Sequence, residues 1–363
     1  MTGGGEEDFL RILKHFHKKY RLTGIFPEGN KIDQYKLFVD EYLVIPNRMF
    51  PFTKFSIKSY SGFSFKGYKK YSLLKTFLKD KKFDLAYIHS SVCIYETLAI
   101  NRSGIPYIIS VREFINPEFV RNKMYRYYLK TAQKIIVISR LLYDEFNKLN
   151  YYSEKIKIIY PAIENPGIKL LIENDGKVLL NIGNIFPDKG QDKVIDAIAK
   201  IKLTHEDVIL KIIGENVDDN YYVHLNDLIK KYGLENNVVF TGAVSKDTVL
   251  EEILKSTAVI ISSSYEGFSL VALETLSCKK PLISTRVGVI PEILIDGENG
   301  LLYDFNDTDL LAGKIELLIK DKKLYDKLSE NGFRTYGNLF NLEDSLNKID
   351  SEFLSVLNQK KNL

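Results

Sequence analysis

Two glutamates, Glu266 and Glu274, flank the stretch of this sequence with the clearest potential for chemistry. A loop of small and polar residues, 262–267, follows an apolar run suited to a buried parallel strand. Ser269 then suits the N-cap of a predicted helix. The first amides of a helix lack intrahelical acceptors and lie at its positive dipole end, which favours anions. An ordinary strand-loop-helix with surface glutamates is the alternative, but the pattern predicts an anion site between two carboxylates.

A second loop, residues 185–190, also lies between a predicted strand and a predicted helix and contains a lysine. It follows a predicted strand at residues 178–184 and leads into a helix whose apolar residues recur at helical spacing. Its lysine, Lys189, is by itself no more than a solvated loop residue.

The ordered combination of Glu266, a Gly-Phe-Ser turn, Glu274 and a Lys-Pro strand start at residues 280–283 resembles a known signature. It is the donor-binding signature of the group-1 (family 4) retaining glycosyltransferases. This resemblance implies an α/β protein of the GT-B fold, with two Rossmann-like domains facing a central cleft. It also implies glycosyl transfer from a nucleotide-diphosphate sugar with retention at the anomeric carbon. The match is specific over residues 178–305 and looser before them.

The resemblance also implies roles for individual residues. Glu266 would contact hydroxyls of the donor sugar, and Glu274 would bind the ribose, since ionised carboxylates accept strong hydrogen bonds from hydroxyl groups. The donor-binding set as a whole comprises Gly183, Asn184, Lys189, Gly214, Ala243, Val244, Gly267, Phe268, Ser269, Leu270, Val271 and Glu274.

One position of this set departs from the family. A Gly-Arg…Lys-Gly element holds the donor diphosphate there, and Asn184 stands where arginine is usual. Lys189 would then be the main side-chain cation, a point charge without the bidentate fork of arginine. The remaining phosphate contacts would come from backbone amides near residues 268–271.

The first half supplies three predicted strands that each end in a polar loop. His89 follows the first, Arg112 and Glu113 the second, and residues 139–140 the third. Ligands of open parallel sheets bind beyond the carboxyl ends of the strands, so these loops should face one crevice. Together with Glu266, His89 and Arg112 form the candidate catalytic set. The family commonly has a histidine at Arg112, and because arginine is no general base, proton transfer would fall to His89 or Glu113.

Length and composition indicate the class of protein and the number of domains. The chain has 363 residues, 45% hydrophobic and 27% charged, which indicates two globular domains. No apolar run approaches the roughly 20 residues that span a bilayer, and the polar N-terminus shows no secretory signal. We therefore expect a cytoplasmic protein. Cys93 and Cys278 read as buried thiols, and residues 307–309 (Asp-Thr-Asp) read as a helix cap, so no metal and no cofactor are expected.

The predicted domains are an N-terminal acceptor domain (1–164), a donor domain (165–335) and a C-terminal helix (336–363) that packs back on the N-terminal domain. A glycine turn at residues 3–5 precedes a helix predicted at residues 6–20. In the family a first strand comes before this turn, and only two residues precede it here. We therefore expect the given chain to lack that strand; an added glycine tag is the alternative.

Charge divides unevenly along the chain. Residues 1–165 carry 28 Lys and Arg against 16 Asp and Glu, a balance of +12, and residues 166–363 carry 23 against 31, a balance of −8. Residues 48–82 hold ten Lys and Arg, one acid and nine Phe and Tyr. A solvated helix face with core aromatics is one interpretation, and a surface for anionic lipid or an anionic acceptor is the other. No motif for nucleic acid accompanies the charge.

The predicted function is therefore sugar transfer from a UDP- or GDP-sugar to a glycan or lipid-linked acceptor. Surface polysaccharide or glycolipid biosynthesis is the expected setting, with peripheral association at the inner membrane face. Two alternatives stay open at this point: a non-catalytic GT-B module that binds a glycan or partner, and another GT-B enzyme such as a nucleotide-sugar epimerase.

Overall fold

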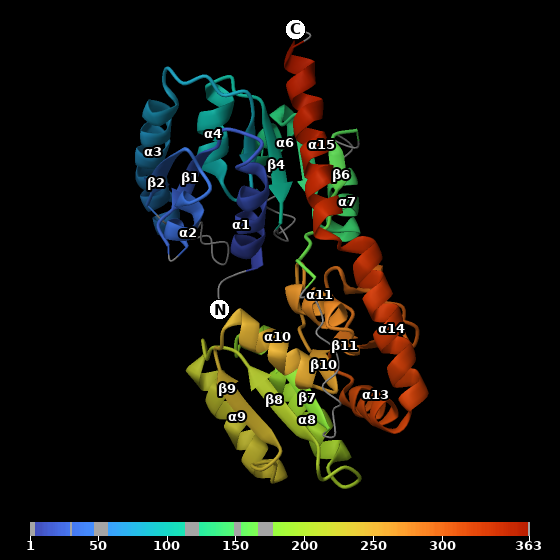
Figure 1. The fold of residues 1–363 in the computed structure, drawn as a ribbon. Helices are drawn as coiled ribbons and strands as arrows, with labels where there is room; N and C mark the ends of the chain where they lie inside the picture. Colours follow the sequence, from blue (N-terminus) through green and yellow to red (C-terminus); the bar gives the residue numbers. More distant parts are fainter. Residues whose placement is uncertain are drawn as a thin grey trace. The chain divides into compact units, whose positions relative to one another are not determined.

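A computed structural model describes residues 4–29, 31–46, 57–112, 123–148, 154–165 and 177–361 of the chain. Two compact units are present (Figure 1). The N-terminal unit joins Thr2–Pro161 with Glu343–Leu363, and the C-terminal unit is Ala162–Leu342. The chain therefore passes between the units twice, and each unit is described by itself.

A parallel sheet forms the centre of the C-terminal unit, with the strand order β12-β11-β10-β7-β8-β9 among the described residues. Its strands are β7 (Val178–Ile182), β8 (Ile209–Ile213), β9 (Val238–Gly242), β10 (Ala258–Ile261), β11 (Leu282–Thr285) and β12 (Leu301–Tyr303). The chain begins in the middle at β7, builds outward to β9, and then returns to β10 on the other side of β7. The order therefore reverses between β7 and β10, and in open α/β sheets ligands bind at that switch point.

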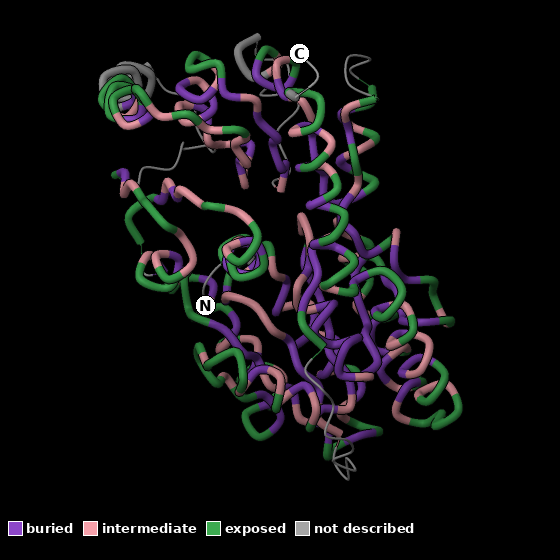
Figure 2. The backbone as a smooth tube through the Cα atoms, turned by 45° about the horizontal axis from the view of Figure 1, so that its top comes forward, coloured by how far each residue is buried: buried purple, intermediate pink, exposed green. Residues whose placement is uncertain are grey.

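Helices connect these strands. They are the short η1 (Pro187–Lys189), α8 (Gln191–Ile201), α9 (Asp219–Tyr232), α10 (Lys246–Lys255), α11 (Leu270–Ser277), α12 (Ile290–Ile293), α13 (Thr308–Lys320) and α14 (Lys322–Leu339). The central strands β10 and β11 are buried along their whole length, as expected for parallel strands covered on both faces. Figure 2 shows that buried stretches of the chain lie inside the unit, with exposed stretches around them.

The N-terminal unit contains two parallel sheets within its described residues, β1-β2 and β3-β4-β5-β6. Their strands are β1 (Thr23–Pro27), β2 (Glu41–Ile45), β3 (Ala86–Ile88), β4 (Tyr107–Val111), β5 (Lys134–Val137) and β6 (Ile156–Ile158). The helices are α1 (Gly4–Phe16), α2 (Ile32–Lys36), α3 (Ile57–Leu78), α4 (Ile94–Arg102), α6 (Lys123–Thr131) and α7 (Arg140–Asn147). Helix α1 ends at Phe16, earlier than the predicted end at residue 20, because residues 17–20 form turns.

The last helix, α15 (Leu342–Lys361), belongs to the N-terminal unit from Glu343 onward. Phe353 packs against Phe16 with ring centroids 5.0 Å apart, and Tyr20 donates a 2.6 Å hydrogen bond to Asp350. The buried residues of α15 extend as far as Val356.

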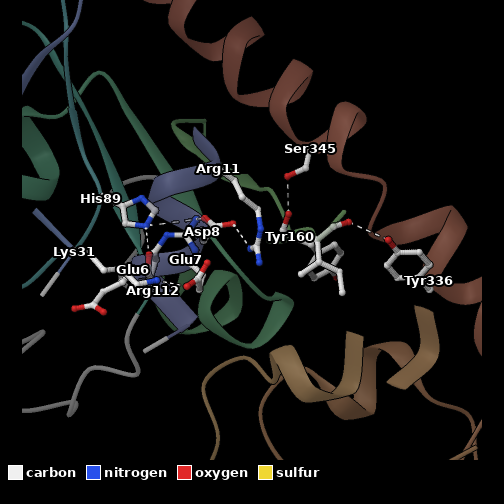
Figure 3. Close-up of polar contacts among 12 residues, drawn as sticks. Glu6, Glu7, Asp8, Arg11, Lys31, His89, Arg112, Tyr160, Tyr336 and Ser345 are labelled. Carbon is white, nitrogen blue, oxygen red and sulfur yellow. Dashed lines mark hydrogen bonds and ion pairs between the residues drawn. The ribbon is translucent and has the colours of Figure 1, made fainter. Parts of the chain in front are cut away.

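Hydrogen bonds secure the chain on either side of the first passage between the units. Ser345 donates to the carbonyl of Tyr160 within the N-terminal unit, at 2.8 Å, and Tyr336 donates to the carbonyl of Ile163 within the C-terminal unit, at 2.9 Å (Figure 3). The chain on each side of the first passage is therefore fixed within its own unit by a side chain from α14 or α15.

The prediction that residues 307–309 form a helix cap is confirmed. Asp307 is the N-cap of α13 and accepts a hydrogen bond from the amide of Leu310 at 2.9 Å, while Asp309 pairs with Lys200. Within the described residues, no helix has the length and apolar character needed to cross a membrane.

Candidate functional sites

Lys189 and Glu266 meet at the switch point of the C-terminal sheet. Lys189 lies on the loop after β7 and Glu266 on the loop after β10, and these two strands are neighbours. Lys189 Nζ donates to Glu266 Oε2 at 2.7 Å. The structure therefore brings together a cation and a carboxylate that the sequence placed 77 residues apart.

The loop of Lys189 is shaped by its neighbours in sequence. Pro187 starts the short helix η1, and Gly190 ends it with φ +62°, a left-handed conformation that favours glycine. A β-carbon at position 190 would overlap the carbonyl oxygen of Ser262. This close approach joins the loop after β7 to the loop after β10.

Glu266 is fixed from two further directions. Ser263 donates to its Oε2 at 3.2 Å, and the loop after β11 passes against its main chain at Gly288. The carboxylate is partly buried, so water is only partly available to it. Both contacts to the carboxylate are made at Oε2 and leave Oε1 unused by them.

Helix α11 begins directly after this loop. Ser269 is its N-cap, as predicted, and accepts a hydrogen bond from the amide of Ala272 at 3.4 Å. The amides of Leu270 and Val271 come first in the helix, where intrahelical acceptors are lacking. Glu274 is buried within α11, and Phe268 packs edge to face on Phe340 in the same unit.

The remaining donor-binding candidates lie at the ends of the same strands. Gly183 follows β7 and Gly214 follows β8, and the two glycines are in close contact. Asn184 is half-buried, and its carbonyl accepts from Gln191 Nε2 at 3.1 Å. The turn after β9 carries exposed Ala243 and half-buried Val244, and Gly267 follows Glu266 in the loop before α11.

The N-terminal unit has its own polar cluster, formed by α1 with the ends of β3 and β4 (Figure 3). Arg112 pairs with Asp8, a buried carboxylate in the first turns of α1. His89 Nε2 lies 3.0 Å from the carbonyl of Gly5 and 4.0 Å from Asp8. The cluster brings together His89 and Arg112 as predicted, whereas Glu113 lies outside the described residues.

This environment keeps His89 neutral. Burial lowers the pKa of His89 well below its ordinary value, the positive charge of Arg112 adds to the effect, and the hydrogen bond to Gly5 opposes it more weakly. Because Nε2 faces a carbonyl oxygen, it carries the proton and Nδ1 does not. Nδ1 is buried, and its hydrogen-bonding capacity is unused among the described residues.

Sequence reasoning missed Asp8. Acidic residues at the start of a helix need no partner beyond the helix dipole, yet Asp8 is buried against Arg112. A signal was present, since Asp8 lies one helical turn before the apolar Ile12 and so on the same side of the helix. In the third loop of this half, Ser139 caps α7 by accepting a hydrogen bond from the amide of Leu142.

No group of three or more His, Cys, Asp or Glu side chains in the described part of the chain is arranged to hold a metal ion.

Comparison with known proteins gives matches along the whole chain. A family model described as glycosyl transferases group 1 matches residues 165–335, and one described as glycosyltransferase family 4 matches residues 2–165. An uncharacterized glycosyltransferase of Methanocaldococcus jannaschii is 31% identical over 283 residues, which cover 76% of each chain. The N-acetyl-alpha-D-glucosaminyl L-malate synthase of Bacillus anthracis is 27% identical over 251 residues, covering 66% of this chain and 64% of the relative.

Among solved structures, Anabaena HepE in complex with UDP has a TM-score of 0.81 at 20% identity, with 98% of this chain and 97% of HepE covered. HepE in complex with UDP-glucose gives a TM-score of 0.79 at 19% identity. At this level of identity the likeness shows the fold, which is that of GT-B proteins with two Rossmann-like domains.

Proposed function

Since the chain belongs to the group 1 glycosyltransferases and is an enzyme of that class, we propose that it transfers a sugar from a UDP-sugar to a glycan or lipid-linked acceptor with retention at the anomeric carbon. The observation that carries this proposal is the contact between Lys189 and Glu266 at the switch point of the C-terminal sheet. In this proposal the Lys189 ammonium binds the diphosphate, and the neighbouring Glu266 carboxylate accepts hydrogen bonds from the sugar hydroxyls.

The leaving group of the proposed reaction is the nucleoside diphosphate, and its departure requires positive potential at the donor site. Cleavage of the bond between sugar and diphosphate develops negative charge on the diphosphate oxygen. Preorganised donors stabilise such charge without reorganising during the reaction. Lys189 and the first amides of α11, at Leu270 and Val271, are the donors that we assign to this task. An ammonium group has three protons, so Lys189 can hold Glu266 and a phosphate oxygen at the same time.

Two carboxylates are assigned to the remaining parts of the donor, the sugar ring and the ribose. We assign Glu266 to the sugar ring and Glu274 to the ribose, one on each side of the diphosphate site. Glu266 is partly buried and Glu274 is buried in α11, and carboxylates in such surroundings form strong hydrogen bonds with hydroxyl donors. We expect the reaction to need no metal, because these groups already supply the charge for the diphosphate.

We propose uridine as the nucleoside of the donor because HepE, which has the same fold, binds UDP and UDP-glucose. GDP remains the second choice to test. Asn184 gives no second cation beside Lys189, so diphosphate affinity should rest more on the helix amides than in members with arginine there.

For the acceptor, the basic N-terminal unit favours an anionic or lipid-linked molecule. The described end of α3 exposes aromatic, apolar and basic side chains, namely Tyr68, Lys69, Leu73 and Lys75. Such a face suits anionic lipid head groups, which attract Lys and Arg by about 1 kcal/mol each. We propose peripheral membrane association through this face and a role in surface polysaccharide or glycolipid assembly. Sedimentation with vesicles containing anionic lipid, compared with neutral vesicles, tests the association.

The first experiment is a thermal-shift titration with UDP, GDP and ADP, with Glu274→Ala alongside. We expect UDP to raise the melting temperature with concentration and the variant to respond more weakly. Incubation with a UDP-sugar and a lipid-linked acceptor should then release free UDP and a stable glycoside. Interconversion of the sugar nucleotide without free UDP would instead point to an epimerase. Absence of any nucleotide response would overturn the proposed donor site.

A further inference from the structure

Four buried polar side chains lie beneath Lys189 and Glu266. They come from the ends of β7 and β11 and from the loop after β10, and each is at most 3% exposed. We call them the buried polar support: Asn181, Ser262, Ser263 and Thr285. Burying polar groups costs free energy unless they are hydrogen-bonded, so the partners of these four side chains indicate what they hold.

One half of the support leads to Lys189. Asn181 Nδ2 donates to the carbonyl of Ile260 at 2.8 Å and to Ser262 Oγ at 3.0 Å. Ser262 Oγ in turn donates to the carbonyl of Lys189 at 2.6 Å. This chain of hydrogen bonds fixes the main chain of Lys189 relative to β7 and β10.

The other half leads to Glu266. Thr285 Oγ1 donates to the carbonyl of Ser263 at 2.7 Å. Ser263 Oγ donates to Glu266 Oε2 at 3.2 Å, which is longer than the roughly 2.5–3.0 Å usual for a bond between a hydroxyl and an oxygen. The carboxylate is therefore linked through Ser263 to the end of β11.

The two halves use adjacent residues. Ser262 is hydrogen-bonded to the main chain of Lys189, and Ser263 is hydrogen-bonded to the Glu266 carboxylate, which accepts a hydrogen bond from Lys189. Because Lys189 and Glu266 are both long side chains with freedom to rotate, neither loop alone would set their spacing. Support through buried hydrogen bonds is how proteins hold functional groups within the narrow geometry that recognition requires.

We infer that the buried polar support positions Lys189 and Glu266 so that the enzyme recognises the sugar half of its donor. This inference rests on the proposed function, since it assigns Glu266 to the sugar hydroxyls. The support touches no part of the donor in this assignment, so its members are positioning residues. Their loss should weaken binding of the sugar far more than binding of the nucleotide.

The test compares UDP with UDP-sugars in the full-length enzyme. UDP-glucose, UDP-galactose and UDP-N-acetylglucosamine are titrated calorimetrically into the wild type, and the tightest is used for Ser263→Ala and Thr285→Val. Valine keeps the shape of threonine and removes its hydroxyl, and Thr285→Ser restores the hydroxyl. Ser264→Ala is the control in the same loop, because the exposed Ser264 hydroxyl donates a long 3.3 Å bond to the carbonyl of Asp188 rather than to Lys189 or Glu266.

We expect Ser263→Ala and Thr285→Val to weaken the UDP-sugar about tenfold, and UDP itself less than about threefold, as the loss of one hydrogen bond predicts. Thr285→Ser and Ser264→Ala should bind both ligands like the wild type. Equal losses for UDP and UDP-sugar, or no loss at all, would overturn the inference while leaving the proposed function intact. A wild type that binds no UDP-sugar would count against the proposed function instead.

A crystal structure of unliganded Ser263→Ala supplies a test that needs no donor. We expect the Glu266 carboxylate to leave its position on Lys189 or to take more than one orientation. An unchanged contact between Lys189 and Glu266 in that structure would overturn the inference, whatever the donor proves to be.

Discussion

Gly288 lies against Glu266 so closely that a β-carbon at position 288 would overlap the Glu266 carbonyl oxygen. Gly288 belongs to the loop after β11, and it has φ +54°, which L side chains seldom adopt. The position of Glu266 therefore depends on a third loop as well. Its contribution is to let the main chain of Glu266 pass at close range.

Substitution of Gly288 by alanine should impair the site more than the fold. The added methyl group must push the main chain of Glu266 aside, so we expect a loss of transferase activity of at least about tenfold. Gly297→Ala is a matched control, because Gly297 also has positive φ, +74°, but open space around its α-carbon. Both variants should lose about 1 kcal/mol of stability from backbone strain. Equal activity in the two variants would refute the steric argument.

Lys189→Gln should weaken UDP binding. The change removes a charge-assisted hydrogen bond worth about 2 kcal/mol, which corresponds to roughly thirtyfold in affinity. Lys193→Gln is the control, since Lys193 lies on the next turn, in α8, and pairs with Asp192 at 3.0 Å. Calorimetric titration of both variants with UDP decides the matter. If both variants lost affinity equally, the effect would be one of net charge and not of position.

The Asp8–Arg112 pair should be a stability element of the N-terminal unit. Asp8→Asn removes the buried carboxylate that pairs with Arg112, and breaking a buried pair in this way costs about 3–5 kcal/mol. Asp33→Asn breaks an exposed pair with Lys36 instead, at 3.2 Å, and should cost less than about 1 kcal/mol. Urea unfolding of the two variants measures the difference. Similar midpoints would show that Arg112 finds other partners.

His89 predicts a pH dependence. Its pKa is lowered in the folded state, so between that value and the ordinary value near 6.5 the unfolded chain binds more protons. Stability is therefore complete above about pH 6.5 and decreases as the pH falls below it. We expect the melting temperature to drop between pH 7.5 and 5.5.

The variant His89→Gln should flatten that decrease, because glutamine does not titrate. The exposed histidine of α9, in His224→Gln, gives the control, which should keep the slope of the wild type. A slope unchanged in His89→Gln would mean that other groups cause the pH dependence.

The sequence predicted the strand, the loop and the Ser269-capped helix around Glu266 because the signal for these elements is local. A strand, a loop with one charged residue and a capped helix follow each other along the chain, and the parallel topology then brings such loops to one edge of the sheet. The residues that sequence reasoning missed act across the chain. Asp8 meets Arg112, and Thr285 meets Ser263, from separate strands and helices. A threonine at the end of an apolar strand carries no mark of the carbonyl that it will contact, so only the assembled sheet identifies it.

The last prediction concerns helix α15, whose residues from Glu343 onward belong to the N-terminal unit. Phe353 is 8% exposed and packs on Phe16, whereas Leu354, the next residue, is 40% exposed. Phe353→Ala should therefore cost about 3–5 kcal/mol, and Leu354→Ala much less. Hydrogen exchange should show faster exchange along α1 and α15 in Phe353→Ala, with the amides of β7 and β10 unaffected, because those strands belong to the other unit. Faster exchange in β7 and β10 as well would show that the two units unfold together.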